Sequence, residues 1–254
     1  MDPLDLNTRI GTAGWSVPPE IDPRDADARR AGGVLGGYAR LFDACELNSS
    51  FYRHHRPSTW ARWAEAVPDG FQFSAKLPKA ISHEARLATG PSLPVLDRFL
   101  EEHAHLGDRR GPLLLQLPPS LVLDEEVADR FFHELRARWN GFVACEPRHA
   151  SWFGATGTDL LARHRVARVV ADPPPDPSAA EPGGWSGLVY VRLHGSPRVY
   201  YSAYGPAYIE KLSRRLRAFA TDDPQRPVWC IFDNTASGAA IEDSLELRRR
   251  LRPE

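Results

Sequence analysis

The clearest signal of a fold in this chain is Val191-Arg192-Leu193-His194-Gly195. It reads as a buried strand that ends on polar side chains. Because residues two apart on a strand share one face, Arg192 and His194 point one way, and Val191 and Leu193 point the other. The stretch therefore predicts a strand whose two polar groups point inward at its end.

Similar short apolar runs, each stopping on a charge or an amide, recur along the chain. They are Cys45-Glu46-Leu47-Asn48, Ser74-Ala75-Lys76, Leu115-Gln116-Leu117, Cys145-Glu146-Pro147-Arg148, Val170-Ala171-Asp172 and Phe232-Asp233-Asn234. With the first run, the pattern predicts eight strands, at 9–15, 44–52, 71–76, 112–117, 142–148, 167–172, 188–194 and 228–232. Helical spacing between most of them predicts helices near 35–42, 59–66, 95–105, 125–139, 159–164 and 206–220, and a last helix that ends near 251.

Strands that alternate with helices favour an α/β fold, and eight such units in 254 residues favour a single (β/α)8 TIM-type barrel over residues 1–254. The segment 173–187 is rich in Pro, Gly, Ala and Ser, so we expect a loop in place of the helix between strands six and seven. The alternative is an open doubly wound sheet. That fold usually carries a Gly-rich nucleotide loop after its first strand, and this sequence has none there.

The overall charge is close to zero, with a formal net charge of −1 and a pI of about 6.8. The chain therefore lacks the strong positive field of a general nucleic-acid binder. Residues 1–5 lack the charge and the apolar run of a signal peptide, and no stretch has the roughly 18 apolar residues of a membrane helix. We expect a cytoplasmic protein that does not engage a membrane. The sequence leaves the oligomeric state open.

The three cysteines have no metal-type spacing. Cys45 and Cys145 directly precede Glu46 and Glu146, so they face outward if the glutamates face inward. Cys230 has the same outward parity. We expect all three to be buried structural thiols that pack against the covering helices.

Several stretches resemble one known family, the YecE-like family (domain of unknown function 72). They are Gly11-Thr12-Ala13-Gly14-Trp15-Ser16, Glu46-Leu47-Asn48-Ser49-Ser50-Phe51-Tyr52, Phe73-Ser74-Ala75-Lys76, 111–119, Glu146-Pro147-Arg148-His149 with Ser151-Trp152, 191–195 and Phe232-Asp233-Asn234-Thr235. The resemblance implies a TIM-type barrel, and it implies no particular reaction. The chain departs from the family at Glu242-Asp243-Ser244, where members more often carry Gly-Asn-Ala. We expect this difference on the last helix to matter little for the site.

In a TIM barrel the carboxyl ends of all strands open onto one face, where active sites lie. The polar strand endings are therefore expected to converge there. They are Glu46, Asn48, Lys76, Gln116, Glu146, Arg148, Asp172, Arg192, His194, Asp233 and Asn234. A purely structural alternative is an ion-pair network, for example of Glu146 with Arg148 or Arg192.

One hypothesis for this face is a divalent-metal enzyme. Glu146, Asp172, His194 and Asp233 end strands five to eight, and this donor set suits Mn, Mg or Zn. The order resembles sugar isomerase-like and endonuclease-like barrels, in which a metal polarises a carbonyl or activates a water. The neighbouring cations, Arg148, Arg192 and Lys76, count against it.

A second hypothesis is metal-free acid/base or hydrolytic chemistry. Glu46 and Glu146 would act as proton donor and base, as in glycoside hydrolysis, with Asp233 beside them. His194 is an alternative general base, and Lys76 can serve as a Schiff-base nucleophile.

This second hypothesis also assigns the residues that would bind the substrate. The aromatic residues Trp15, Tyr52, Trp152 and Tyr204 would stack on a sugar ring or a base, and Asn48, Gln116 and Asn234 would supply amide groups. Arg148 and Arg192 favour an anionic substrate.

A third hypothesis is a non-catalytic ligand binder or a binder of single-stranded nucleic acid, which the neutral charge disfavours. We favour an enzyme, of hydrolase or isomerase type, that acts on a small anionic or sugar-containing substrate. Other polar residues receive ordinary interpretations. We expect His103 and His105 to lie exposed on a helix.

Overall fold

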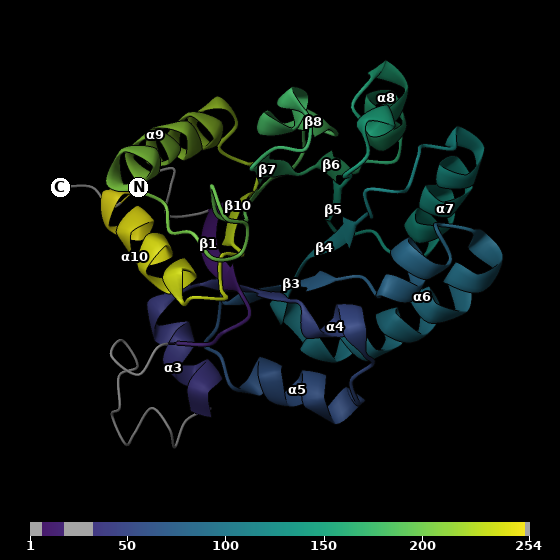
Figure 1. Cartoon of the computed structure of the whole chain (residues 1–254). Helices are drawn as coiled ribbons and strands as arrows, with labels where there is room; N and C mark the ends of the chain where they lie inside the picture. Colours follow the sequence, from purple (N-terminus) through teal and green to yellow (C-terminus); the bar gives the residue numbers. More distant parts are fainter. Residues whose placement is uncertain (1–6, 18–32, 252–254) are drawn as a thin grey trace.

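The computed structural model describes residues 7–17 and 33–251. Its strands form a ring, and the longer helices lie outside that ring (Figure 1). The ring contains β1 (Thr8–Ala13), β2 (Ala44–Leu47), β3 (Gln72–Lys76), β4 (Arg110–Gln116), β5 (Val143–Glu146), β6 (Ala167–Arg168), β7 (Val170–Asp172), β9 (Val189–Leu193) and β10 (Val228–Phe232). Among the described residues, no helix is long and apolar enough to cross a membrane.

The sixth strand closes the ring because its two halves pair with different neighbours. β6 pairs with β5, β7 pairs with β9, and only Val169 separates the two halves. All other neighbours around the ring pair in parallel, in the order β9, β10, β1, β2, β3, β4, β5. Counting β6 and β7 as one strand, the barrel has the eight parallel strands that the sequence predicted, so the TIM-type fold is confirmed.

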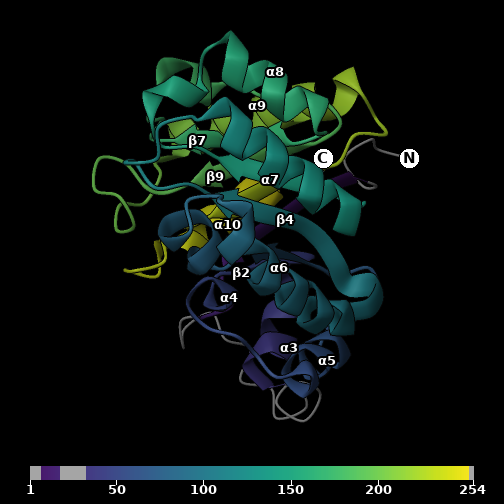
Figure 2. The ribbon, with the colours of Figure 1, turned by 90° about the vertical axis from the view of Figure 1, so that its right-hand side faces the viewer.

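The outer layer contains the helices α3 (Gly33–Leu41), α5 (Pro57–Glu65), α6 (Thr89–His103), α7 (Glu125–Arg138), α8 (Ala155–Arg163), α9 (Pro206–Asp222) and α10 (Ala239–Leu251). Seen from the side, α6 and α7 lie next to each other against the strands (Figure 2). Shorter turns are α4 (Ser49–Tyr52), a π-helical turn (Ala80–Glu84) and 3-10 helices at Ala104–Arg109 and Ala150–Trp152.

The connection between β7 and β9 departs from the regular barrel as predicted. It holds a 3-10 turn, Pro177–Ala180, and the short strand β8 (Gly183–Gly184) in place of a helix of the outer layer. β8 pairs antiparallel with β6. The Pro- and Gly-rich composition explains this, because neither residue supports a helix interior.

The second strand is shorter than predicted, since it ends at Leu47 and the next residues form α4. The hydroxyl of Ser50 is the local cause. Its Oγ lies 2.9 Å from the carbonyl oxygen of Leu47 and 2.7 Å from that of Lys76. A side-chain hydroxyl that bonds to nearby backbone competes with the strand ladder and turns the chain. This turn brings Asn48 to the carboxyl end of the barrel.

The apolar core has two shells, one on each side of the barrel wall. Cys45 and Cys145 are fully buried in the outer shell with Leu115 and Trp60, and Cys230 lies in the outer shell beside Leu247. The prediction of outward-facing, buried thiols is therefore confirmed.

The inner shell combines small and large residues. Ala44, Ala144 and Ala167 leave room for the rings of Tyr190 and Trp229, which stack with their centroids 6.1 Å apart. This mixture of sizes fills the barrel without a pore.

His103 corrects one expectation, because it is fully buried rather than exposed. It lies four residues after Phe99 and therefore shares the buried face of α6, stacked on that ring and flanked by Trp60 and Trp139. Burial, with a smaller contribution from Arg110, lowers the pKa of His103 to about 3. His103 is therefore a neutral packing residue.

Candidate functional site

Arg192 lies at the centre of the carboxyl end of the barrel and is fully buried. Its guanidinium forms a two-pronged contact with Glu46: Nη2 lies 2.6 Å from Oε1 and Nε lies 2.9 Å from Oε2. The parity that the sequence predicted places both side chains inside the barrel. This bidentate geometry is the strongest form of an arginine–carboxylate pair.

Two further carboxylates complete the contacts of Arg192. Its Nη1 lies 2.9 Å from Glu146 Oε2, and its Nη2 lies 3.0 Å from Asp233 Oδ2. The side-chain amide of Gln116 donates to the same Glu146 oxygen at 3.0 Å. One arginine thus joins carboxylates from the ends of β2, β5 and β10.

His194 bridges two of these carboxylates. Its Nε2 lies 2.7 Å from Glu146 Oε1, and its Nδ1 lies 3.0 Å from Asp233 Oδ2. A protonated imidazole donates from both nitrogens, and each nitrogen faces an acceptor here. Both nitrogens of His194 are therefore occupied by contacts within the network.

The protonation states of the network follow from a balance between burial and neighbouring charge. Burial alone would lower the pKa of Arg192, but the surrounding carboxylates, Asp233 first, raise it well above its ordinary value. Burial alone would raise the pKa of Glu146, but Arg192 and His194 hold it well below. Burial likewise opposes charge on His194, but Glu146 and the hydrogen bond with Asp233 raise its pKa. Neighbouring charges thus oppose the effect of burial and favour the charged forms of Arg192, Glu146 and His194.

Arg148 extends the network toward solvent. Its Nη2 lies 2.6 Å from Glu146 Oε1 and 2.8 Å from His194 Nε2, so both residues converge on one carboxylate oxygen. The side chain of Arg148 is 20% exposed, whereas that of Arg192 is fully buried. Arg148 is therefore the guanidinium that a ligand can reach.

Lys76 ends β3 and is 7% exposed at the edge of the network. Its Nζ lies 4.2 Å from the centroid of the Phe51 ring, and no carboxylate of a described residue forms an ion pair with it. Burial and the nearby charge of Arg192 lower the pKa of Lys76 from 10.5 to about 8. Lys76 is therefore the titratable group of the site whose two protonation states are both populated near neutral pH.

Tyr190 and Ser74 belong to the network and were not among the predicted site residues. The hydroxyl of Tyr190 lies 2.9 Å from Glu46 Oε2 and 2.8 Å from Ser74 Oγ. The signal that could have identified Tyr190 was the parity of β9, because it lies two residues before Arg192 on the same inward face. Its aromatic character instead suggested ordinary packing.

Tyr200 is a third residue that was not among the predicted site residues. Its ring meets that of His194 edge-on at 5.9 Å between centroids, and its residue is 44% exposed. Burial of its hydroxyl, with the negative charge of Asp233, raises the pKa of Tyr200. Tyr200 lies on a loop, where strand parity gives no information about side-chain direction.

A cleft of about 460 Å³ adjoins the network at the ends of β1 and β2. It is lined by Gly14, Trp15, Ser16, Val34, Glu46, Leu47, Asn48, Ser49, Arg53, His55 and Trp63. Trp15 packs edge-on against Trp63 at 5.4 Å. Asn48 donates to Asp233 Oδ1 at 3.5 Å, while its own Oδ1 is buried without a hydrogen-bond partner. The cleft thus has an aromatic wall and an unsatisfied acceptor.

Asp172 does not join the convergent group, contrary to expectation. Its Oδ1 accepts a hydrogen bond from the hydroxyl of Tyr204 at 2.9 Å, and that hydroxyl in turn accepts from the backbone N–H of Gly195 at 2.9 Å. Tyr204 is therefore a buried structural residue that ties two strand ends together, and it offers no stacking face to a substrate. Its ring packs on Tyr208 at 4.4 Å.

Asn234 also turns away from the site because it has the opposite parity to Asp233. Its Nδ2 donates to Asp243 Oδ2 at 2.7 Å and to the carbonyl of Ser202 at 3.0 Å. Asp243 accepts the backbone N–H of Tyr204 through the same oxygen at 3.0 Å. The expectation that the last helix matters little is therefore wrong at Asp243, which anchors the two loops beside the site.

Two other predicted stacking residues lie outside the cleft. Trp152 is 1% exposed, and its Nε1 donates to the carbonyl of Leu121 at 2.9 Å, so it is a core residue. Tyr52 is 71% exposed on α4 and packs on Phe51. Of the four aromatic residues proposed for stacking, Trp15 alone lines the cleft.

The predicted metal ligands do not form a metal site. Asp172 is bound to Tyr204, and both nitrogens of His194 face carboxylates that Arg192 also contacts. In residues 7–17 and 33–251, no three His, Cys, Asp or Glu side chains are placed to hold a metal ion. The donor set is thus neutralised by arginine, and it does not fit a divalent cation.

Comparison with known proteins places the chain in a family. The sequence model described as "Protein of unknown function DUF72" matches residues 9–254. The UPF0759 protein YecE of Escherichia coli K12 is 32% identical over 173 residues, which cover 65% of this chain and 59% of that protein. The match therefore spans less than two thirds of the relative's length.

Solved structures show the same fold. A DUF72 family protein of Enterococcus faecalis superimposes with a TM-score of 0.77 at 20% identity, over 98% of each chain. One from Thermotoga maritima gives 0.72 at 20% identity, over 96% of this chain and 99% of that one. A xylose isomerase-like TIM barrel fused to a 4-hydroxyphenylpyruvate dioxygenase gives 0.53 at 13% identity, over 97% of this chain and 42% of that one. By the match over residues 9–254, the chain belongs to the DUF72 family, whose YecE-like members it resembles.

Proposed function

We propose that this protein is an enzyme that performs acid/base chemistry on a small anionic or sugar-containing substrate, with Lys76 as the proton-exchanging group. The observation that carries the proposal is the place of Lys76. It is a buried amine without a carboxylate ion pair, at the edge of a network whose other charges are paired. Burying an unpaired charge is unfavourable, and such groups are concentrated in functional sites.

The pKa of about 8 suits Lys76 to this role. A general acid or base works best when its pKa lies near the working pH, because both forms are then available. His194 suits the role less well, since both of its nitrogens are bonded to carboxylates and its pKa is raised. Its role is to fix the positions of Glu146 and Asp233.

Glu46 and Glu146 position other groups in this proposal. They do not act as the proton donor and base of a glycosidase. A catalytic carboxylic acid needs a raised pKa, and the pKa of Glu146 is lowered. Glu46 and Glu146 also share one partner, Arg192, which restrains both side chains. They orient the arginine and balance the charge around Lys76.

The cleft supports a substrate with both apolar and polar faces. A sugar ring packs its C–H face on an aromatic side chain, and Trp15 offers one here. Asn48 Oδ1 is a buried acceptor without a partner, so a substrate hydroxyl that donates to it would remove an unfavourable unsatisfied group. Lys76 and Arg148 lie outside the lining of the cleft, in the adjoining network, and would meet an anionic substituent that extends beyond it.

A second candidate mechanism also involves Lys76. The neutral amine can add to a substrate carbonyl carbon, and the resulting carbinolamine then loses water to form an imine. The low pKa of Lys76 favours this step as well, because only the unprotonated amine is a nucleophile. The two mechanisms differ in whether a covalent bond to Lys76 forms.

Binding to Lys76 can be tested by thermal shift with sugars, sugar acids and sugar phosphates. We expect an anionic sugar to stabilise the native protein and the Lys79→Met variant, and to stabilise Lys76→Met far less. Lys79 is a matched control because it is a nearby exposed lysine paired with Glu84. Equal stabilisation of Lys76→Met would contradict the proposal.

Covalent chemistry is tested separately. Cyanoborohydride added with a sugar ligand that carries a carbonyl would reduce an imine and fix the ligand to the chain. A mass increase on the peptide that contains Lys76 would support the imine route. If the ligand binds and turns over without such an adduct, proton transfer by Lys76 is the supported route.

A further inference from the structure

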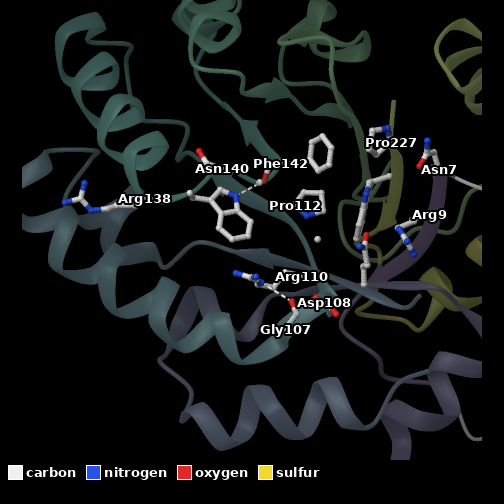
Figure 3. A pocket seen from close by; sticks show the side chains of 15 residues that line it. Asn7, Arg9, Gly107, Asp108, Arg110, Pro112, Arg138, Asn140, Phe142 and Pro227 are labelled. Carbon is white, nitrogen blue, oxygen red and sulfur yellow. Dashed lines mark hydrogen bonds between the residues drawn. The ribbon is translucent and has the colours of Figure 1, made fainter. Parts of the chain in front are cut away.

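A second pocket lies at the opposite end of the barrel, where the strands begin. It has a volume of about 700 Å³, within the range of small-ligand sites. It is lined by Asn7, Arg9, Gln72, Gly107, Asp108, Arg110, Gly111, Pro112, Arg138, Trp139, Asn140, Gly141, Phe142, Pro227 and Trp229. None of these residues belongs to the charged network (Figure 3).

Two arginines of this pocket lack a carboxylate ion pair among the described residues. Within the described part of the chain, the hydrogen bonds of Arg9 go to backbone oxygens, with Nη1 2.8 Å from Gly70 O and 3.3 Å from Asp43 O. Arg110 Nε lies 2.9 Å from Gly107 O, a contact drawn in Figure 3. Arg130, Arg163 and Arg250 elsewhere on the described surface, by contrast, are paired with carboxylates. These two therefore keep donor capacity for an anion.

Arg138 differs from these two and marks the limit of the pocket. It forms ion pairs with Asp97 and Glu134 on the helical surface. In Figure 3 its side chain points away from the other labelled residues. Its charge is already balanced, so Arg9 and Arg110 are the cations that a ligand would meet.

Each of the two arginines lies over an indole ring. Arg110 is 5.5 Å from the centroid of Trp139, and Arg9 is 6.0 Å from that of Trp229. A glycine lies against each of the two indole rings, so the backbone approaches both rings closely. A Cβ on Gly141 would come within 2.3 Å of the Trp139 ring, and one on Gly111 within 2.6 Å of the Trp229 ring. The aromatic walls are therefore built into the pocket, because no side chain larger than hydrogen fits beneath them.

The rim supplies further polar and aromatic groups. Phe142 is 37% exposed and packs on Trp185 with centroids 6.1 Å apart. Gln72 is half-buried at the start of β3 and offers an amide. Asp108 is the carboxylate that lines the pocket, and it forms no ion pair with Arg9 or Arg110.

We propose that this pocket is a second ligand site, which takes an organic anion with a flat ring, such as a nucleotide. The anionic group would bind to Arg9 and Arg110, and the ring would pack on Trp139 or Phe142. Guanidinium groups bind phosphate and carboxylate oxygens in a fixed fork geometry, and aromatic walls favour planar ligands. Burial lowers the pKa of Arg9, so an anion beside it would relieve an unfavourable environment. The site is separate from the proposed Lys76 site and does not depend on it.

Isothermal titration calorimetry with AMP tests the proposal. We expect AMP to bind the native protein and to lose about 10-fold or more in affinity with Arg110→Gln. Arg130→Gln, on the exposed face of α7 and paired with Glu126, is the control and should bind normally. Lys76→Met should also bind AMP normally, which distinguishes this site from the one proposed above. Circular dichroism checks that each variant is folded.

Further probes separate the parts of the proposal. Ribose 5-phosphate has the anion without the flat ring, and benzoate has a ring with a carboxylate. In the Lys76→Met variant, weaker binding of ribose 5-phosphate than of AMP supports the aromatic wall; equal binding there overturns the assignment to a ring-bearing ligand. If benzoate alone binds through Arg110, the ligand is an aromatic acid rather than a nucleotide. Absence of binding by all three probes, or equal affinity of Arg110→Gln for AMP, overturns the proposal.

Discussion

The two halves of the barrel interior are built on the same strands and are filled in opposite ways. At the lower level of β9 and β10, Tyr190 and Trp229 stack with their planes 6° apart. Two to four residues further along, Arg192 and Asp233 form an ion pair at 3.0 Å. Along each strand, the inward-facing side chains therefore change from aromatic packing residues to buried charges within two to four residues.

The two halves differ in how their stability responds to the loss of one side-chain contact. Apolar filling contributes in proportion to buried area, so the loss of one contact is local. A buried charge network is stable only while every member has a partner, because an uncompensated charge in the interior is strongly unfavourable. The lower half therefore supports the fold, and the upper half holds a fixed charge pattern around Lys76.

The largest effect in this comparison is expected from Arg192→Met. The substitution leaves Glu46, Glu146 and Asp233 buried without their common partner. We expect a loss of about 3–5 kcal/mol in the free energy of unfolding, measured with urea.

Arg148→Met is the control for this substitution, because Arg148 is partly exposed and contacts a carboxylate that keeps its other partners. It should lose about 1 kcal/mol or less. Similar losses of unfolding free energy for Arg192→Met and Arg148→Met would show that the buried network depends on each partner no more than a surface ion pair does.

A smaller effect is expected at the boundary between the halves, from Tyr190→Phe. The ring is retained, so packing on Trp229 persists, while Glu46 loses a donor at 2.9 Å. A hydrogen bond to a charged acceptor contributes about 1.5–3 kcal/mol, which is the loss we expect in urea unfolding. A loss below about 0.5 kcal/mol would mean that Arg192 alone satisfies Glu46.

An effect of opposite sign is expected from Lys76→Met. The fold lowers the pKa of Lys76 from 10.5 to about 8, so the protonated form is disfavoured in the folded state. Below about pH 8 the native protein therefore bears this penalty in full, and the penalty fades as the pH rises toward 10.5. Removing this penalty is worth up to about 3 kcal/mol, so we expect Lys76→Met to stabilise the fold at pH 7 by as much as that.

Stability curves between pH 6 and 10 check this sign. The advantage of Lys76→Met should shrink as the pH increases, while Lys79→Met should follow the native protein throughout. An advantage that grows with pH would place the lysine in an environment that favours its charged form. The same variant is expected to lose ligand binding, so stability and function change in opposite directions at this residue.

The alternation of side chains along a strand correctly predicted which residues of the regular strands point into the barrel and which point out. Glu46, Lys76, Glu146 and Arg192 lie inside the barrel for that reason, and the cysteines lie outside it. The expected convergence failed for Asp172 and Asn234, at and beyond the strand ends. Asp172 is bound to Tyr204, and Asn234 to Asp243, because hydrogen bonds to the loops and to α10 hold them there.

Local sequence patterns account for the barrel, for the irregular connection after β7 and for the position of the charges at the carboxyl ends of the strands. These features follow from periods of two and 3.6 residues and from Pro and Gly, all of which act locally. Only the tertiary structure decided which charge meets which. Arg192 joins Glu46 across 146 positions of sequence and Glu146 across 46. Pairing between distant strands depends on barrel closure and register. The same closure and register leave Lys76 without an ion pair to a described carboxylate, which the proposed function requires.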